Sequence, residues 1–486
     1  MAGGPDIMKL WLSKATVLFV LILTTTAYGQ QQGLSFNFFG GGARSEGMGQ
    51  AFLAISDDGT AGGWNPAGLN IQQKTLMVFS YGFLQPRGNF SFYDDERLFG
   101  TYDHGGSYGS LNYWNVLSPI RVKGHHVVLN LSYTRNFDIY YKFGENLFGD
   151  WSGTKPNAFY ERNGGVSSIN VAMGTRIYKQ LSFGIAGNIY NGKMVTDEKR
   201  FFERGIYTFF GQADYRSNVE VIDSTGLSGF NTTIGFLYAS GALRVGLVAR
   251  TPFDLKGKSD TTHYVISTRN GVEIQQDDYY IDGFKLFITD TVYVNNMTSK
   301  MQMPLMIGLG LGYNVSDNWL VAGDIEYKKF SGKKILNLEN IQLTAGGESI
   351  ETFEAHDPNW SDVIQLRLGS EYLLNSKFGQ IPLRVGFRNE AFPEGNISNY
   401  SVVYEGPKGG SVNDSTRIFY LFNYDNKKTT GYSVALGTGI HWSQILLDVA
   451  YTYTTYKQEI HSSENVLRSE NDWKNHHLNL TFTGYF

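Results

Sequence analysis

The chain has 486 residues, a formal net charge of −4 and no cysteine, and it is rich in glycine, tyrosine and phenylalanine. Its near-neutral charge gives no reason to expect a nucleic acid as a partner. The lack of cysteine excludes thiolate catalysis, thiolate metal sites and a lipid-anchored N-terminal cysteine.

The first 29 residues have the composition of a signal peptide. Lys9 and Lys14 flank the start of a short apolar run at residues 17–23, and the small residues Ala27 and Gly29 fit a signal-peptidase site. We therefore predict export, with cleavage after Gly29. The rest of the chain contains no run of 18 apolar residues that would predict a transmembrane helix.

Residues 30–72 include the unusual stretch RSEGMGQAFLAISDDGTAGGWNPAGLN, which is too irregular for a strand. Glycine and alanine allow such a segment to turn tightly and to pack closely against a wall. Asn65-Pro66 fits a helix cap followed by proline at the first helical position. We predict that this segment plugs the lumen of a barrel formed by residues 73–486.

The barrel prediction rests on alternation with a period of two. At residues 303–312, for example, Leu305, Ile307 and Leu309 alternate with small or flexible residues, as in a strand with one face toward lipid. About fourteen such segments, most of them 9 to 13 residues long, begin near residues 74, 107, 125, 166, 180, 231, 242, 303, 318, 362, 381, 431, 443 and 475. The second segment alternates poorly. The fold class predicted is thus all-β, an antiparallel transmembrane barrel of about fourteen strands.

The connections between these segments alternate between long and short. Long connections are expected at residues 85–106, 138–165, 192–230, 251–301, 329–360, 391–430 and 457–474. Short periplasmic turns and long external loops produce this alternation in outer-membrane barrels. The chain also ends on Phe486, which closes an alternating strand and resembles the C-terminal signature that the outer-membrane assembly machinery reads.

Ionisable side chains on the strands are expected to face the lumen, because a charge facing lipid costs a few kcal/mol. The predicted polar wall consists of Arg244, Arg250, Asp324, Glu326, Arg367, Glu371, Arg384, Arg388, Glu390 and Asp448. This wall could anchor the plug and bind a ligand carboxylate, or it could consist of mutual ion pairs that fill a wet lumen. Asp57 and Asp58 could pair with these arginines or cap a turn.

The plug sequence resembles the N-terminal hatch of the FadL/TodX family, outer-membrane transporters of long-chain fatty acids and aromatic hydrocarbons. The resemblance implies a fourteen-stranded barrel with a hatch, and it implies that ligand leaves sideways at a kinked third strand. The hatch or gating residues that it suggests, with Trp64 added as a neighbour, are Gly47, Gly49, Asp57, Asp58, Trp64, Asn65, Pro66 and Ala67. The third predicted strand, residues 125–137, has neither glycine nor proline, so the sequence predicts no kink there.

Signals of chemistry are weak. Residues 105–109 match the G-x-S-x-G pattern of a nucleophile elbow but lie at a boundary between loop and strand, so no enzyme is predicted. The paired histidines at residues 125–126 and 476–477 point to opposite faces of their strands and predict no metal site. No cofactor is expected.

The resulting prediction is an outer-membrane channel of a Gram-negative cell for passive uptake of fatty acids or aromatic hydrocarbons. Its expected partners are a hydrophobic small molecule, outer-membrane lipid and lipopolysaccharide, and the assembly machinery through Phe486. The alternative is an accessory barrel of a protein secretion system, like the PorV branch of the same superfamily, which binds cargo proteins.

Overall fold

The computed structural model describes residues 41–94, 97–146, 157–208, 211–269, 272–273, 280–281, 284–285, 290–336, 360–405, 417–461 and 467–486. The predicted signal peptide and residues 30–40 lie outside these ranges. Within them, no helix is long and apolar enough to cross a membrane.

Fourteen strands of the described residues form a closed antiparallel ring, which confirms the predicted architecture. Neighbours in the ring are also neighbours in the chain, and the last strand closes on the first over nineteen paired residues. The ring consists of β1 (Leu76–Asp94), β3 (Tyr108–Val122), β4 (His125–Asp138), β6 (Asn157–Tyr178), β7 (Leu181–Thr208), β8 (Gly211–Ser240), β9 (Leu243–Arg250), β15 (Met306–Ser316), β16 (Trp319–Lys328), β18 (Val363–Ser376), β19 (Gly379–Glu405), β20 (Arg417–His441), β21 (Ile445–His461) and β22 (Leu467–Tyr485).

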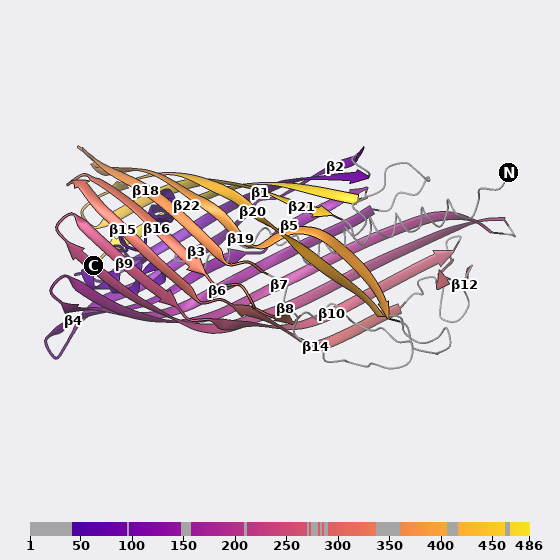
Figure 1. The fold of residues 1–486 in the computed structure, drawn as a ribbon, viewed down its shortest axis with the longest axis horizontal. Coiled ribbons are helices and arrows are strands. Elements are labelled where there is room, and N and C mark those ends of the chain that lie inside the picture. Colours follow the sequence, from indigo (N-terminus) through magenta and orange to yellow (C-terminus); the bar gives the residue numbers. More distant parts are fainter. Residues whose placement is uncertain are drawn as a thin grey trace.

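Further strands extend this ring at one end, where Figure 1 shows several strands projecting well past the others. They are β2 (Arg97–Gly105), β5 (Tyr141–Asn146), β10 (Phe253–Arg269), β11 (Val272–Glu273), β14 (Asp290–Met303) and β17 (Ile335–Leu336), while β12 (Tyr280–Ile281) and β13 (Phe284–Lys285) pair only with each other. Short turns join the strands at the opposite end, which we therefore call the periplasmic end.

Strand length is where the sequence prediction was wrong. β7 has 28 residues and β8 has 30, and much of the sequence expected to form long loops continues the strands instead. The reason is physical. Alternation marks only the part of a strand with lipid on one side, whereas the backbone hydrogen bonds continue where both faces meet polar surroundings.

The outer face of the ring is apolar. In β15 the side chains of Ile307, Leu309 and Leu311 are 42%, 43% and 53% exposed, while the residues between them are buried toward the lumen. Similar rows occur on the other strands of the ring. Apolar side chains exposed in such continuous rows require hydrocarbon around them, so the ring is a membrane-spanning barrel.

The second strand, β3, alternates poorly because its pairing with β1 is irregular. Ser80 pairs with Tyr113 but the next residue, Tyr81, pairs with Leu111, so Asn112 is an extra residue in β3. A bulge of this kind shifts the alternation by one residue. The inward residues on the regular side of the bulge are Tyr113, Asn115 and Leu117.

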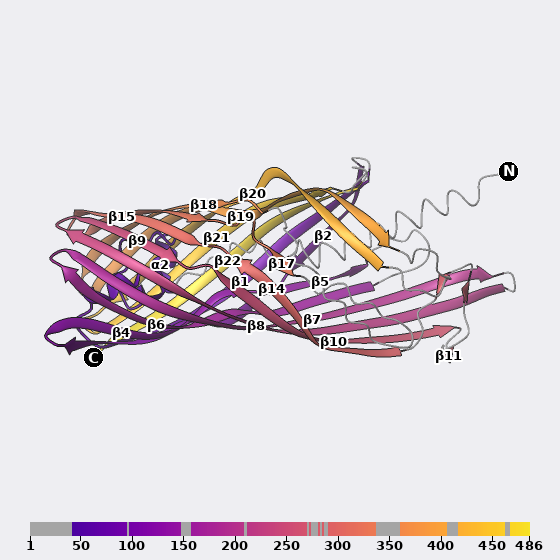
Figure 2. The ribbon, with the colours of Figure 1, turned by 60° about the horizontal axis from the view of Figure 1, so that its bottom comes forward.

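Residues 41–72, here called the luminal segment, lie inside the barrel near its periplasmic end (Figure 2). They form the short helices α2 (Ala43–Gly47) and α3 (Ala61–Trp64) and the 3₁₀-helix η2 (Pro66–Ile71). As the sequence predicts, the Asn65 side chain caps η2 by accepting a hydrogen bond from the backbone N–H of Ala67 at 3.1 Å, and Pro66 begins the helix.

Deleting Phe486 tests whether this residue serves assembly rather than stability. Its ring is 74% exposed, and only its backbone N–H bonds inward, to the carbonyl of Thr75 at 2.8 Å. We expect the shortened chain to refold in detergent with an unfolding midpoint close to that of the full chain, but to reach the outer membrane in much lower yield. Equal yields in cells would refute the assembly role.

Candidate functional site

Glycines of the barrel wall make room for the luminal segment. A Cβ atom added to any of nine lumen-facing glycines would lie less than 3 Å from an atom of this segment, and the nine come from seven different strands: Gly174, Gly184, Gly235, Gly246, Gly308, Gly310, Gly312, Gly369 and Gly386. We call them the glycine girdle. The wall and the luminal segment therefore fit each other at backbone distance.

Two glycines of the luminal segment itself make the matching approach. Gly47 lies against Gly437 and the Arg384 side chain, and Gly49 has a φ of 62°. A Cβ on Gly49 would come within 2.5 Å of the backbone nitrogen of Phe387. Both were suggested as gating residues by the family resemblance, and the structure places both in close contact with the wall.

Four more of the suggested hatch residues, at positions 64–67, are buried inside the barrel. Asn65 donates to the carbonyl oxygens of Leu53 and Phe236, at 2.9 and 3.0 Å. Pro66 and Ala67 lie against Gly184, and Trp64 is fully buried, with its ring centroid 5.7 Å from that of Phe52. The Asn-Pro-Ala step is thus a fixed contact between the luminal segment and strands β7 and β8.

A continuous chain of ion pairs, extended at one end by a histidine hydrogen bond, crosses the lumen and passes through the luminal segment. In order from β20 to β9, it contains His441, Asp448, Arg384, Glu371, Arg44, Asp57 and Arg244. Arg44 is the central link, because it bonds Glu371 through both Nε and Nη2 at 3.0 Å and also contacts Asp57. We call this the charged strap. It ties the luminal segment to two walls of the barrel.

The two neighbouring aspartates divide the roles that the sequence left open. Burial opposes ionisation of Asp57, but the guanidinium groups of Arg44 and Arg244 hold its pKa below the usual range. Asp58 accepts hydrogen bonds from the backbone N–H and the hydroxyl of Thr60, at 2.8 and 2.6 Å, and burial raises its pKa. Asp57 therefore pairs with arginine, while Asp58 chiefly caps a turn and lies 3.5 Å from Arg44.

Strand β16 shows how the lumen is layered. Its inward side chains, read away from the periplasmic end, are Leu320, Ala322, Asp324, Glu326 and Lys328, and Phe330 follows just beyond the strand. The first two pack against the luminal segment, and Asp324 accepts hydrogen bonds from its backbone at Phe52 and Leu53, at 2.7 and 3.0 Å. A charged layer comes next, and an apolar layer follows.

The charged layer is formed by buried pairs within the wall. Glu326 lies 3.1 Å from the amine of Lys328 and 3.3 Å from the guanidinium of Arg367. Arg388 pairs with Glu390 and also lies 3.6 Å from Glu46 of α2. Lys328 and Glu46 were missing from the predicted wall.

Arg250 completes the set of predicted wall residues, and it donates to the carbonyl of Gly63 at 3.1 Å. All ten predicted wall residues face the lumen. Five of them bond the luminal segment, as in a wall that anchors the plug, and the other five pair with charges of the wall, as in mutual ion pairs that fill the lumen.

The opposite half of the wall carries amides instead of ion pairs. Asn115, Asn130, Asn170, Asn188 and Asn231 come from β3, β4, β6, β7 and β8 and form a ladder of side-chain hydrogen bonds of 2.7 to 3.3 Å. The lumen wall is therefore electrostatically divided. Single asparagines in separate strands gave no signal in the sequence, because only the barrel register brings them together.

Above the charged layer the lumen is apolar and largely aromatic. A buried cluster includes Val166, Tyr190, Leu255, Met303, Met306, Phe330, Trp360 and Val363. The rings of Tyr190 and Phe253 stack at 4.7 Å with an interplanar angle of 7°. We call this cluster the apolar layer. It is the part of the described lumen that is best suited to a hydrophobic ligand.

An aromatic column stands on the other wall and extends the same type of surface. It consists of Phe392, Tyr456 and Trp473, whose neighbouring ring centroids lie 4.9 and 5.8 Å apart. All three side chains are at most 5% exposed. The sequence analysis did not identify these residues, because Phe392 and Trp473 lie in segments that it assigned to loops and Tyr456 immediately precedes one of them.

The third strand is irregular near its far end, which the lack of glycine and proline in residues 125–137 did not indicate. Within the described residues the ladder between β3 and β4 ends at the pair Tyr113 and Thr134, and the register between β4 and β6 shifts just after Arg135. Gly164 and Gly165, with φ of 147° and 155°, lie opposite this point on the neighbouring strand β6. Arg135 donates to the carbonyl of Gly164 at 2.6 Å.

Two tyrosines lie just beyond the end of that ladder. The ring centroids of Tyr108, on β3, and Tyr140, after β4, are 4.7 Å apart. Gly106, at the junction between β2 and β3, lies against the Tyr140 ring. Side chains rather than backbone hydrogen bonds thus join the two strands at this height.

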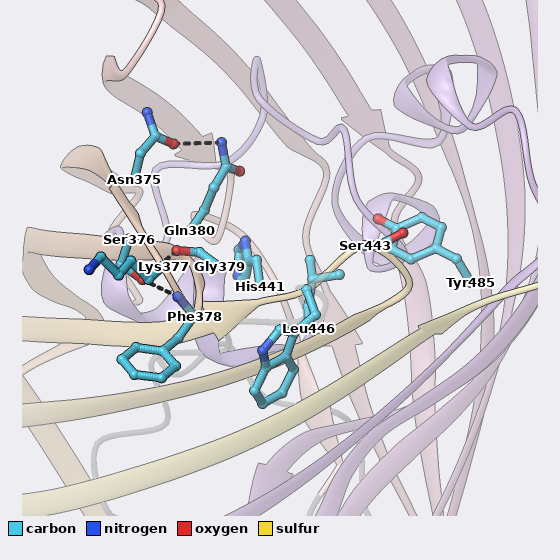
Figure 3. Close-up of a pocket in the computed structure, with 11 residues that line it drawn as sticks. Asn375, Ser376, Lys377, Phe378, Gly379, Gln380, His441, Ser443, Leu446 and Tyr485 are labelled. Carbon is cyan, nitrogen blue, oxygen red and sulfur yellow. Dashed lines mark hydrogen bonds between the residues drawn. The ribbon is translucent and has the colours of Figure 1, made fainter.

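A cleft of about 850 Å³ lies at the periplasmic mouth (Figure 3). It is bounded by the turn at residues 375–380, where Gln380 donates to Asn375 at 3.2 Å, and by His441, Leu446 and Tyr485. His441 begins the charged strap, at 3.0 Å from Asp448. The cleft therefore reaches from the periplasmic side to the first link of the strap.

Among the described residues, no group of three or more histidines, aspartates or glutamates is placed to hold a metal ion. The serine of the G-x-S-x-G pattern, Ser107, lies at the junction between β2 and β3.

Comparisons with known proteins agree with this fold. A model of the BamG family matches residues 12–391, and no curated protein matches the sequence. A FadL homologue from Pseudomonas aeruginosa is 12% identical, with 92% of this chain and 99% of that chain covered and a TM-score of 0.57. The Pseudomonas putida toluene transporter TodX is 13% identical, covering 93% and 100% with a TM-score of 0.53.

The Ralstonia pickettii toluene transporter TbuX gives 13% identity, coverage of 93% and 100%, and a TM-score of 0.51. At such low identity these likenesses concern the fold, and they confirm the resemblance to the FadL and TodX barrels.

Replacing Gly386 by alanine tests the fit between the wall and the luminal segment. Its Cβ would lie 1.9 Å from the backbone nitrogen of Gly49, so the segment must shift. We expect a folded barrel whose luminal segment becomes accessible to protease. The matched control is Gly187→Ala, where the added methyl meets only Phe230 at 3.5 Å. Protection equal to that of the control would contradict the close fit.

Replacing Arg44 by methionine tests the charged strap. Removing one member of a buried ion-pair network typically costs about 3–5 kcal/mol, so the population with a displaced luminal segment should rise at least ~100-fold. Single-channel recording in planar bilayers should show openings that are far more frequent than in the unmodified protein. Arg121→Met, on an exposed position of β3, is the control. Unchanged opening frequency would mean that the strap does not hold the segment.

Proposed function

This chain belongs to the BamG family, and from that premise and the layered lumen we propose that it is an outer-membrane channel for passive uptake of hydrophobic compounds. The observation that carries the proposal is the apolar layer with its aromatic column, which lies above a luminal segment held by ion pairs. Toluene transporters and a FadL homologue with the same fold support it.

The apolar layer would receive the ligand. Tyr190, Phe253, Phe330 and Trp360 present flat faces and edges that favour aromatic or aliphatic groups over water. Because charged and amide side chains lie directly beneath this layer, an apolar ligand would stop there until the luminal segment moves.

The luminal segment would act as a hatch, with unequal attachment to its surroundings. On one side the charged strap holds α2 to β18 through Arg44 and Glu371. On the other side α3 and η2 lie on the amide half of the wall, through small residues and neutral hydrogen bonds such as that from Asn115 to the carbonyl of Gly59. Neutral contacts are weaker than charge-assisted ones, and α3 also receives the charge-assisted bond from Arg250 to the carbonyl of Gly63, so η2 would move first.

The break between β3 and β4 offers a sideways exit on that same amide half. Displacement of the Tyr108 and Tyr140 rings would open the wall without breaking backbone hydrogen bonds between these two strands. This route is proposed in preference to exit through the periplasmic mouth, where the charged strap would lie in the path.

The decisive test is whether the purified barrel retains a bound hydrophobic molecule. Native mass spectrometry should detect added toluene or a long-chain fatty acid bound to the protein, and the preferred one of the two identifies the substrate class. Tyr456→Ser should reduce retention about tenfold or more, because it removes an aromatic wall of the lumen. Tyr453→Ser is the control, since it lies on the outer face of the same strand. No retention and no uptake of either molecule by cells would refute the proposal.

A second candidate function is an accessory role in outer-membrane assembly or secretion. The family name points to the outer-membrane assembly machinery, and the hatch and the wall side chains fill the periplasmic half of the lumen. Its test is copurification: the full-length chain, isolated from native membranes without crosslinking, would carry assembly or secretion components in fixed ratio. Isolation of the barrel without such components would favour the channel function over the accessory role.

A further inference from the structure

The seam between β1 and β22 carries a cleft of about 860 Å³ on the outside of the barrel. Arg87 and Asn89 of β1 and Asp472 and Lys474 of β22 line it, and Gly105 and Gly106 form an edge that has no side chains. This cleft is separate from the lumen, because Asp472 and Lys474 alternate along β22 with the buried, inward side chain of Trp473.

Height in the membrane can be read from the outward pairs along the seam. From the periplasmic end they are Phe79 with Phe482, Tyr81 with Leu480, Phe83 with Leu478, Gln85 with His476, and Arg87 with Lys474. The two cations thus stand four residues beyond the last apolar pair. At about 3.3 Å per residue and a tilt near 45°, this is roughly 9 Å above the hydrocarbon, at the height of the lipid headgroups of the outer leaflet.

Arg87 and Lys474 face each other directly across the seam, and both are exposed. Like charges placed directly opposite in a sheet destabilise it. No carboxylate among the described residues lies within ion-pair distance of either cation: Arg87 donates to the amide oxygen of Gln85 at 3.3 Å, and Asp472, which lines the same cleft, pairs with Lys457 at 3.1 Å. The pair has the geometry of a site whose counter-ion comes from outside the chain.

We propose that this cleft binds the phosphate group of a phosphorylated glycolipid in the outer leaflet. Arg87 and Lys474 hold the phosphate between them, since arginine forms paired hydrogen bonds with phosphate and lysine adds a point charge. The sugar lies over the glycine edge, and the acyl chains run down the apolar pairs from Phe83 and Leu478. The continuous apolar ladder beneath the cations is what distinguishes a lipid from free phosphate.

The test uses the full-length barrel incorporated into nanodiscs that contain either diphosphorylated lipid A or its dephosphorylated form. We expect the unmodified protein, extracted in mild detergent, to retain the phosphorylated form at least about tenfold better by native mass spectrometry. Arg87→Gln combined with Lys474→Gln should lose this preference. The control, Lys377→Gln, removes an exposed cation at the periplasmic mouth and should keep it. Equal retention by protein and double variant would overturn the proposal.

A single substitution separates binding from folding. Arg87→Glu places opposite charges across the seam, so it should raise the unfolding midpoint of the lipid-free barrel in detergent while abolishing the preference for phosphorylated lipid. A variant that is more stable and still retains that lipid would overturn the proposal. Added lipid A should raise the unfolding midpoint of the unmodified barrel, and millimolar inorganic phosphate should not. An equal rise with phosphate alone would exclude the lipid as the specific ligand.

Discussion

The fold depends on the requirement that every backbone amide in hydrocarbon has a hydrogen-bond partner within the protein. A sheet meets this requirement only by closing, and here the closure is the ladder between β1 and β22. Closure of fourteen strands leaves a lumen that wall side chains alone do not fill. The luminal segment follows from that geometry, and the glycine girdle follows from the segment, because the backbone of the wall and that of the segment must approach closely.

Much of this was predictable from the sequence, for identifiable reasons. Strand positions follow from alternation wherever lipid lies on one side, as at Ile307, Leu309 and Leu311, so all fourteen strands were located. The inward direction of Arg384 or Asp448 follows from the energy of placing a charge in lipid. The Asn65-Pro66 cap is local and needs no tertiary information.

What was missed depends on long-range register or on regions without lipid. The amide ladder joins residues from Asn115 to Asn231, and nothing near any one of them in sequence indicates the next. The aromatic column lies at and beyond the limits of the predicted strands, where alternation had faded. The irregularity of the third strand lies opposite glycines on its neighbour, so inspection of residues 125–137 alone did not reveal it.

The length of β7 and β8 has a consequence for where this protein meets its environment. A strand of 30 residues measures about 100 Å, and at a tilt near 45° it rises about 70 Å, of which the apolar band of a barrel occupies only about 25 Å. These strands therefore rise far above the bilayer, past the shorter strands of the wall, so a molecule approaching from outside meets this projecting part of the sheet before it reaches the height of the membrane (Figure 1).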